Sequence, residues 1–393
     1  VLHNVDRLTG RLLEAVLRRE GRSAILMEET ETTIAKSLGD NTGQCIPINA
    51  VVEGFVECLD RHNLAPGETV LWMSEACMAC NITLYPHHMK TLLNARGGGL
   101  EKAGVYVGDL FFKDISPRAS FNAVFAYMFG GLLRRVACRL RPYECHAGDV
   151  DQALEVSLEI LYEAFMGRIK KQDALAAVME RFEKIPVAKT ERPKVAIFGD
   201  LYSRDNRVMN QDLIRFIERH GGEVVTTPYS DYARMIANPY FRKWFYERKF
   251  LTLISSKALM TTITRLERTY YRLFEPLLGE PMATFDDPPE AILAQYGVRI
   301  EHTGESLDNL LKVHYIKKHY PDVTLFVQAS PAFCCPSLVT EAMARRIEDV
   351  TGVPVVPITY DGTASRKNDI IIPYLQYPRS AVPRRRRTLN RTG

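Results

Sequence analysis

Two stretches of the chain present the same succession of features, although their sequences differ. In "ETVLWMSEACMACNITLYPHHMKTLLNARGGGLEKAGVYVGD", residues 68–109, an apolar run leads to two cysteines, and a helical pattern and a second apolar run follow. The same order appears in "VTLFVQASPAFCCPSLVTEAMARRIEDVTGVPVVPITYDG", residues 323–362. Strand, helix and strand in this order are typical of parallel sheets. We therefore expect two α/β domains that face each other across a cleft, with both cysteine pairs beyond the carboxyl ends of strands, where ligands bind.

The rest of the second half extends this pattern. "KVAIFGD", residues 194–200, has the continuous apolar run of a buried parallel strand. "NQDLIRFIERHGG", residues 210–222, has helical spacing and ends on two glycines, and "EVVTTP" follows as another strand. Because strand, helix and strand occur twice, the second half predicts a doubly wound parallel sheet of the α/β class.

These patterns divide the chain into an N-terminal helical segment, two α/β domains and a tail. The opening residues have the pattern of a helix already under way at Val1, so we expect a fragment of a longer protein. A helical insertion at 239–278 is rich in lysine and arginine, which predicts either a solvated helix face or a docking surface for an acidic partner or for substrate phosphates. The expected boundaries are 1–40 for the N-terminal segment, 41–190 for the first α/β domain with its helical linker, 191–380 for the second α/β domain and 381–393 for a basic disordered tail.

Composition places the chain among ordinary globular proteins. Of its 393 residues, 46% are hydrophobic and 25% are charged. No apolar run approaches the roughly 18–20 residues that span a bilayer, and no signal-peptide pattern opens the chain, so we expect a cytoplasmic protein without a membrane partner. The net charge of +4 depends on six arginines in residues 378–393, which favours a solvated tail over specific nucleic-acid binding.

The eight cysteines are too few for a disulfide scaffold in a chain of this length, and their clustering favours metal binding. Cys77 and Cys80 form a C-x-x-C pair, a spacing that lets two thiolates reach one metal. Cys334 and Cys335 are adjacent, so their side chains diverge and would serve two metal atoms or two parts of a larger cluster. Cys45 precedes a helix start, which favours a thiolate.

Two further groups of residues leave alternatives open. Cys145 lies in a polar loop and is a further candidate ligand, whereas Cys58 and Cys138 lie on apolar helices and read as core residues. A zinc site would require histidine partners and would leave Cys45 and the adjacent pair unexplained. A redox dithiol would explain only the C-x-x-C pair, and an iron–sulfur cluster uses the most thiols. The histidines available to a zinc site are His87, His88 and His146.

The sequence has no phosphate-binding loop of the form G-x-x-x-x-G-K-[ST] and no G-x-G-x-x-G fingerprint after a strand. We therefore expect no nucleotide site in this chain.

Several motifs resemble the 2-hydroxyacyl-CoA dehydratase superfamily, and within it the activase-linked branch that includes the double-cubane cluster proteins. The resemblance extends over roughly residues 40–380, and the vicinal cysteines are its most specific element. The motifs are "GQCIPINAVVEG", "SEACMACNITLY", "RPYECHAGDVD", "KVAIFGDLYSRDN" and "CCPSLVTEAMARRIEDVTGVPVVPITYDG".

The resemblance implies two flavodoxin-like domains with an iron–sulfur cluster in the cleft between them. Cys45, one of the C-x-x-C pair, and Cys334 or Cys335 match the three cluster-binding regions. Doubled cysteines in two of these regions favour the double-cubane (8Fe–9S) type over a 4Fe–4S cluster. A double cubane would require about six thiolates. The six expected ligands are therefore Cys45, Cys77, Cys80, Cys145, Cys334 and Cys335, with Cys58 as the alternative to Cys145.

The resemblance also implies a function. We expect an iron–sulfur reductase component that receives low-potential electrons from an ATP-dependent activase, separate or fused, and reduces a small molecule or an acyl-CoA. ATP would bind only to the activase, and a homodimer or heterodimer is expected. One alternative is a 2-hydroxyacyl-CoA dehydratase subunit, which eliminates water through a ketyl radical. Another is a non-catalytic, metal-bearing scaffold, and no residue beyond the cysteines carries a defined catalytic role.

Overall fold

A four-stranded parallel sheet forms the centre of the second half of the chain in the computed structural model, which describes residues 1–74, 80–301 and 304–378. Its strands lie in the order β4-β3-β5-β6, so the chain begins in an inner strand, moves to one edge and then returns past its starting point. The strands are β3 (Lys194–Gly199), β4 (Glu223–Val225), β5 (Val323–Pro331) and β6 (Val355–Tyr360).

Both faces of this sheet are buried, as the continuous apolar runs predict. Successive side chains of β3 point to opposite faces, so Val195 and Ile197 join one hydrophobic cluster while Ala196 and Phe198 join another. Helices α12, α13 and α15 contribute to the cluster around Phe198, and α9 and α16 to the opposite one. The helical segments of this half are α8 (Leu201–Asp205), α9 (Leu213–Arg219), α12 (Pro289–Gln295), α13 (Glu305–His319), α14 (Cys335–Ala342), α15 (Ala344–Thr351), η6 (Lys367–Ile371) and α16 (Ile372–Gln376).

The first half contains a smaller parallel sheet. Strand β1 pairs with β2, and Leu2 forms parallel bridges with both Trp72 and Leu26, so extended backbone near the N-terminus lies beside β1. The elements of this region are β1 (Val70–Ser74), β2 (Gly104–Gly108), α2 (Glu31–Ser37), η1 (Leu38–Asp40), α3 (Ile46–Arg61), η2 (Pro66–Glu68), η3 (Asn81–Leu84), α4 (Tyr85–Arg96) and η4 (Leu100–Lys102).

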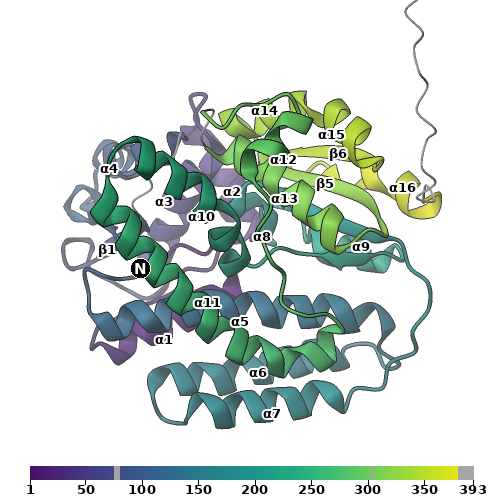
Figure 1. Ribbon diagram of the computed structural model, residues 1–393. Helices are drawn as coiled ribbons and strands as arrows, with labels where there is room; N and C mark the ends of the chain where they lie inside the picture. The colour runs from purple at the N-terminus through teal and green to yellow at the C-terminus, as the bar shows by residue number, and fades with distance from the viewer. Residues whose placement is uncertain (75–79, 302–303, 379–393) are drawn as a thin grey trace, which may run out of the picture.

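A layer of long helices lies below both sheets in the view of Figure 1. Apolar side chains of these helices, such as Leu12, Phe129 and Phe274, form one continuous cluster. The layer consists of α1 (Arg7–Arg19), α5 (Pro117–Leu140), η5 (Arg141–Tyr143), α6 (Asp149–Met166), α7 (Lys171–Glu183) and α11 (Phe250–Leu278). Helix α11 forms a hairpin with the preceding helix, α10 (Tyr229–Tyr246).

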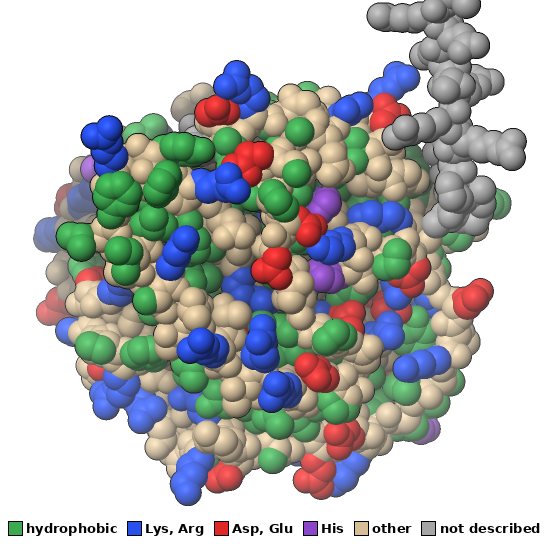
Figure 2. All heavy atoms as spheres, viewed as in Figure 1, with side chains coloured by type: hydrophobic (Ala, Val, Ile, Leu, Met, Phe, Trp, Pro, Cys, Tyr) green, Lys and Arg blue, Asp and Glu red, His purple; other side chains and the backbone are tan. Residues whose placement is uncertain are grey.

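The hairpin of α10 and α11 contains the predicted insertion at 239–278, and it exposes apolar side chains to solvent. Large apolar side chains around its turn are exposed, among them Tyr246, Leu251 and Ile254. Figure 2 shows hydrophobic side chains gathered at the upper left, the position of this turn in Figure 1, with lysine and arginine side chains among them.

The predicted α/β class is confirmed, because both sheets are parallel and helices alternate with strands. Two flavodoxin-like domains stay a prediction, since the first sheet has two strands in the described part of the chain. The basic tail at 381–393 lies outside the described residues. Of the helices described, none combines the length and apolar character needed to cross a membrane.

Candidate metal centre

Three of the six predicted ligands approach one another from distant parts of the sequence. Cys45 is the N-cap of α3, Cys80 directly precedes η3, and Cys334 is the N-cap of α14. A backbone hydrogen bond of 3.4 Å from Ile46 N–H to the Ala332 carbonyl links the start of α3 to the segment after β5. This contact brings Cys45 next to Cys334, whose side chains are 4% and 3% exposed.

The site lies where the strand order of the larger sheet reverses. From β3 the chain crosses to β4 on one side, and β5 then lies on the other side of β3. At such a point the loops after the two central strands diverge and leave room for a ligand. Asp200 follows β3 and Cys334 follows β5, so both lie at the carboxyl ends of the two central strands.

Glycine is required at the end of β3. Gly199 has a φ of +117°, and a Cβ at this position would lie 2.3 Å from the Ala329 carbonyl oxygen. The close approach lets the next amide, that of Asp200, donate to the same carbonyl at 3.0 Å. The Asp200 carboxylate then caps α8 by accepting from Ser203 N–H at 2.7 Å, which fixes its position beside Cys334.

The thiols of Cys45 and Cys334 are hydrogen-bonded to each other. This bond raises the pKa of Cys45 far above its ordinary value and lowers that of Cys334, so Cys45 is the donor and Cys334 the acceptor. The buried Tyr85 hydroxyl also donates to the Cys45 sulfur. We expected the helix start to favour a thiolate at Cys45; in the structure it is Cys334, also at a helix start, whose pKa is lowered.

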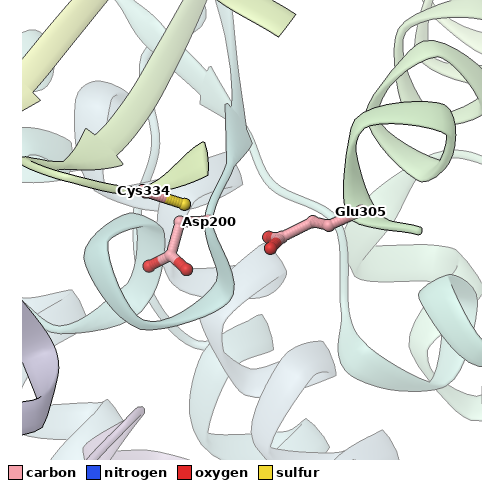
Figure 3. A group of neighbouring side chains, drawn as sticks. All are labelled: Asp200, Glu305 and Cys334. Carbon is pink, nitrogen blue, oxygen red and sulfur yellow. The ribbon is translucent and has the colours of Figure 1, made fainter. Parts of the chain in front are cut away.

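Two carboxylates complete this cluster. Oxygen atoms of Asp200 and Glu305 and the sulfur of Cys334 all lie within 4.8 Å of one another. Figure 3 shows the Glu305 side chain reaching from the start of α13 toward Asp200 and Cys334, which come from the strand side. Glu305 and Cys334 are 6% and 3% exposed, and Asp200 is partly exposed.

Burial dominates the electrostatics of this group. Burial and then the neighbouring Asp200 charge raise the pKa of Glu305 well above its ordinary value, and burial also raises that of Asp200. For Cys80, burial with added charges of Glu305, Cys334 and Asp200 raises the pKa to about 12. Glu305, Asp200 and Cys80 are thus acids with little positive charge nearby to stabilise their ionised forms.

The nearest buried cation is Lys312 on α13. Burial lowers its pKa to about 8, and its Nζ donates to the Gly199 carbonyl at 3.2 Å and to Asn309 Oδ1 at 3.1 Å. These bonds tie α13 to the end of β3 and so help to place Glu305 opposite Asp200.

The remaining predicted ligands do not all reach this site. Cys335 is exposed in the first turn of α14, and Cys145 is exposed in a loop where its N–H donates to the Pro186 carbonyl. Cys77 lies outside the described residues. Cys58 and Cys138 are buried in the hydrophobic core, as their apolar helices indicated.

Sequence reasoning missed the carboxylates of the site. Asp200 could have been predicted as a site residue from the sequence, because it is the first residue after a buried strand. Glu305 had no such signal, since no predicted strand ends beside it in the sequence. Both positions depend on how α8 and α13 pack on the sheet.

Two cavities lie outside the cysteine group, and neither is lined by Cys45, Cys80 or Cys334. One of about 270 Å³ is lined by charged residues that include Arg135 and Glu223 on the far edge of the larger sheet. A crevice of about 10 Å³ between α10 and the start of α13 is lined by Gly304 and Asp308, the neighbours of Glu305 in the chain.

Comparison with known proteins gives no identification: no protein-family model matches the chain, and a search of curated proteins finds no significant match.

Proposed function

We propose that this chain is an iron–sulfur reductase component. Cys45, Cys80 and Cys334 would hold the cluster, and electrons of low potential would come from an ATP-dependent activase. The cluster would supply one-electron chemistry to a small molecule or an acyl-CoA. The observation that carries the proposal is the convergence of three thiols, distant in sequence, on one buried point at the carboxyl ends of parallel strands.

The chemistry of the donor set fits an iron–sulfur cluster. Thiolates are the usual ligands of such clusters, and Cys334 already has a lowered thiol pKa. Cys45 and Cys334 begin helices of 16 and 8 residues, so backbone N–H groups and helix dipoles point toward the centre. These positive ends favour the negative charge that a thiolate-bound cluster carries.

The residues around the thiols have defined positioning roles. Tyr85 donates a hydrogen bond to the Cys45 sulfur, which orients that side chain. The apolar core that surrounds Cys45 and Cys334 excludes water from the centre. A dry setting of this kind influences the potential of a bound cluster, together with hydrogen bonds to its sulfurs.

Metal analysis tests the proposal. After anaerobic purification, we expect iron and acid-labile sulfide in nearly equal amounts: about four irons per chain for a cubane and about eight for a double cubane. Cys334→Ser should lose most of the iron, whereas Cys138→Ser, an equally buried cysteine of the core, should keep it. Zinc without iron would overturn the proposal in favour of a metal-bearing scaffold.

A dehydratase acting on 2-hydroxyacyl-CoA is the second candidate, and the surface of α11 favours it. Lys257, Arg265, Arg268 and Arg272 are exposed, and the helical repeat of 3.6 residues places them within one face. Within the described part of the chain none of the four forms an ion pair. Such a row of cations matches the phosphates of coenzyme A.

Coenzyme A binding separates this candidate from a reductase of small molecules. Titration calorimetry with free coenzyme A should show binding that falls steeply with added salt and is weakened about tenfold in Arg265→Ala/Arg268→Ala. The matched control is Arg299→Ala, which removes an exposed arginine elsewhere on the surface. Equal affinity of all three proteins would reject the α11 surface as the coenzyme A site.

A further inference from the structure

Glu305 is a buried acid at the start of α13. Its Oε1 atom has no hydrogen-bond partner in the described part of the chain, and the side chain is 6% exposed. Buried carboxylates are normally paired, hydrogen-bonded or bound to a metal. An unsatisfied carboxylate oxygen beside the Cys334 sulfur therefore indicates a binding partner.

Neighbouring buried groups on α13 are satisfied, which sets Glu305 apart. Asp308, one turn later, accepts a 2.7 Å hydrogen bond from the Tyr232 hydroxyl. Lys312 is bonded to Gly199 and Asn309 and lies with its Nζ 4.7 Å from the Tyr232 ring centroid. Among the buried side-chain atoms described on α13, the one without a hydrogen-bond partner is thus on the carboxylate that Figure 3 shows pointing at Asp200 and Cys334.

The spacing of the three side chains suits a metal. The oxygens of Asp200 and Glu305 and the Cys334 sulfur lie within 4.8 Å of one another, so the three side chains face one point. Carboxylate and thiolate together are an acceptable donor set for iron, since iron accepts both ligand types.

We infer that Glu305, with Asp200 as a second oxygen donor, is a direct ligand of the metal centre that Cys334 holds. The inference rests on the proposed iron–sulfur function and gives the centre mixed sulfur and oxygen ligation. In a cubane of four irons, Glu305 would serve an iron that no thiol binds.

Mössbauer spectroscopy of protein loaded with iron-57 and sulfide tests this inference. In the wild type, about one quarter of the iron should have the higher isomer shift of an oxygen-bound site, and Glu305→Gln should lose that component or about one quarter of the iron. Asp200→Asn, which keeps the α8 cap, should weaken the same component. The control is Asp308→Asn, an equally buried acid of α13, whose spectrum should equal that of the wild type.

Metal-free protein provides a second measurement. In metal-free protein, Glu305→Gln keeps the shape of the side chain and should leave the melting temperature unchanged, while the loaded variant loses iron. An unchanged spectrum and unchanged iron content in folded Glu305→Gln would overturn the inference and leave the proposed function standing. A wild type that binds no iron would instead overturn the proposed function.

Discussion

Arg134 on α5 forms a buried ion pair with Asp205 on α8, with 2.6 Å between Nη1 and Oδ1. The same guanidinium pairs with Asp6, the N-cap of α1, and Asp205 also binds Arg204. The network therefore joins the layer of long helices to the segment that directly follows Asp200. It fixes one wall of the cysteine site from a distance.

Asp205→Asn should destabilise the protein by about 3–5 kcal/mol, because it leaves Arg134 and Arg204 buried with too little negative charge. Urea unfolding followed by circular dichroism measures this loss. Asp322→Asn, which breaks an exposed pair with Lys194, should cost less than about 1 kcal/mol. Equal effects of the two substitutions would show that the buried network contributes no more than a surface pair.

Gly199→Ala should destabilise the protein by roughly 2–4 kcal/mol, because the new methyl meets the Ala329 carbonyl and the positive φ is strained. The same change should lower iron content, since Asp200 follows directly. Gly39→Ala is the matched control, with nothing within 4 Å of its Cβ position. A wild-type melting temperature in Gly199→Ala would contradict the close approach of β3 and β5.

The pH dependence of stability should carry a contribution from Glu29. Burial raises its pKa from 4.5 to about 7, and the Tyr202 hydroxyl donates to it at 3.0 Å. A raised carboxyl pKa means that the folded protein favours the protonated form, so this contribution is fully present below pH 4.5 and is lost as pH rises to about 7. At pH 8, Glu29→Gln should therefore be more stable than the wild type by up to about 3 kcal/mol.

Thermal unfolding of both proteins at pH 5 and pH 8 measures this effect. The stability difference should be small at pH 5 and large at pH 8. A difference that is equal at both pH values would assign the effect to packing against Tyr202 rather than to ionisation.

Differential alkylation should separate metal ligands from other thiols. In native protein loaded with iron and sulfide, Cys45, Cys80 and Cys334 should react with iodoacetamide more slowly than in native metal-free protein. Cys145 is exposed and should react at the same rate in loaded and metal-free protein. Peptide mass spectrometry measures each site.

The same experiment tests the sixth ligand that we expected from the sequence. If the metal protects Cys145 from alkylation, Cys145 is a ligand of the centre. A second chain or a rearranged loop would then bring it close to the other ligands. The reactivity of Cys77 is measured in the same spectra. Cys138, buried in the core, should react slowly with or without metal.

The local pattern of apolar residues determined much of the fold. The run "KVAIF" is buried on both faces and forms β3, and the glycine pair after "FIERH" follows the end of α9. The sequence likewise predicted cysteines at the carboxyl ends of strands, because the strands of a parallel sheet all end at the same edge. Cys80 and Cys334 were therefore predicted from their places after strands, Cys45 was grouped with them only by the family resemblance, and a ligand role for each stays a prediction.

Tertiary structure alone decided the rest. Glu305 meets Asp200 only because Lys312 and the apolar face of α13 dock that helix on β3, a contact between residues more than a hundred positions apart. Likewise, Cys334 points into the core and the adjacent Cys335 is exposed because the first turn of α14 separates their directions. Sequence periodicity specifies which face of an element is apolar, but the distance between side chains on different elements depends on packing that no local pattern encodes.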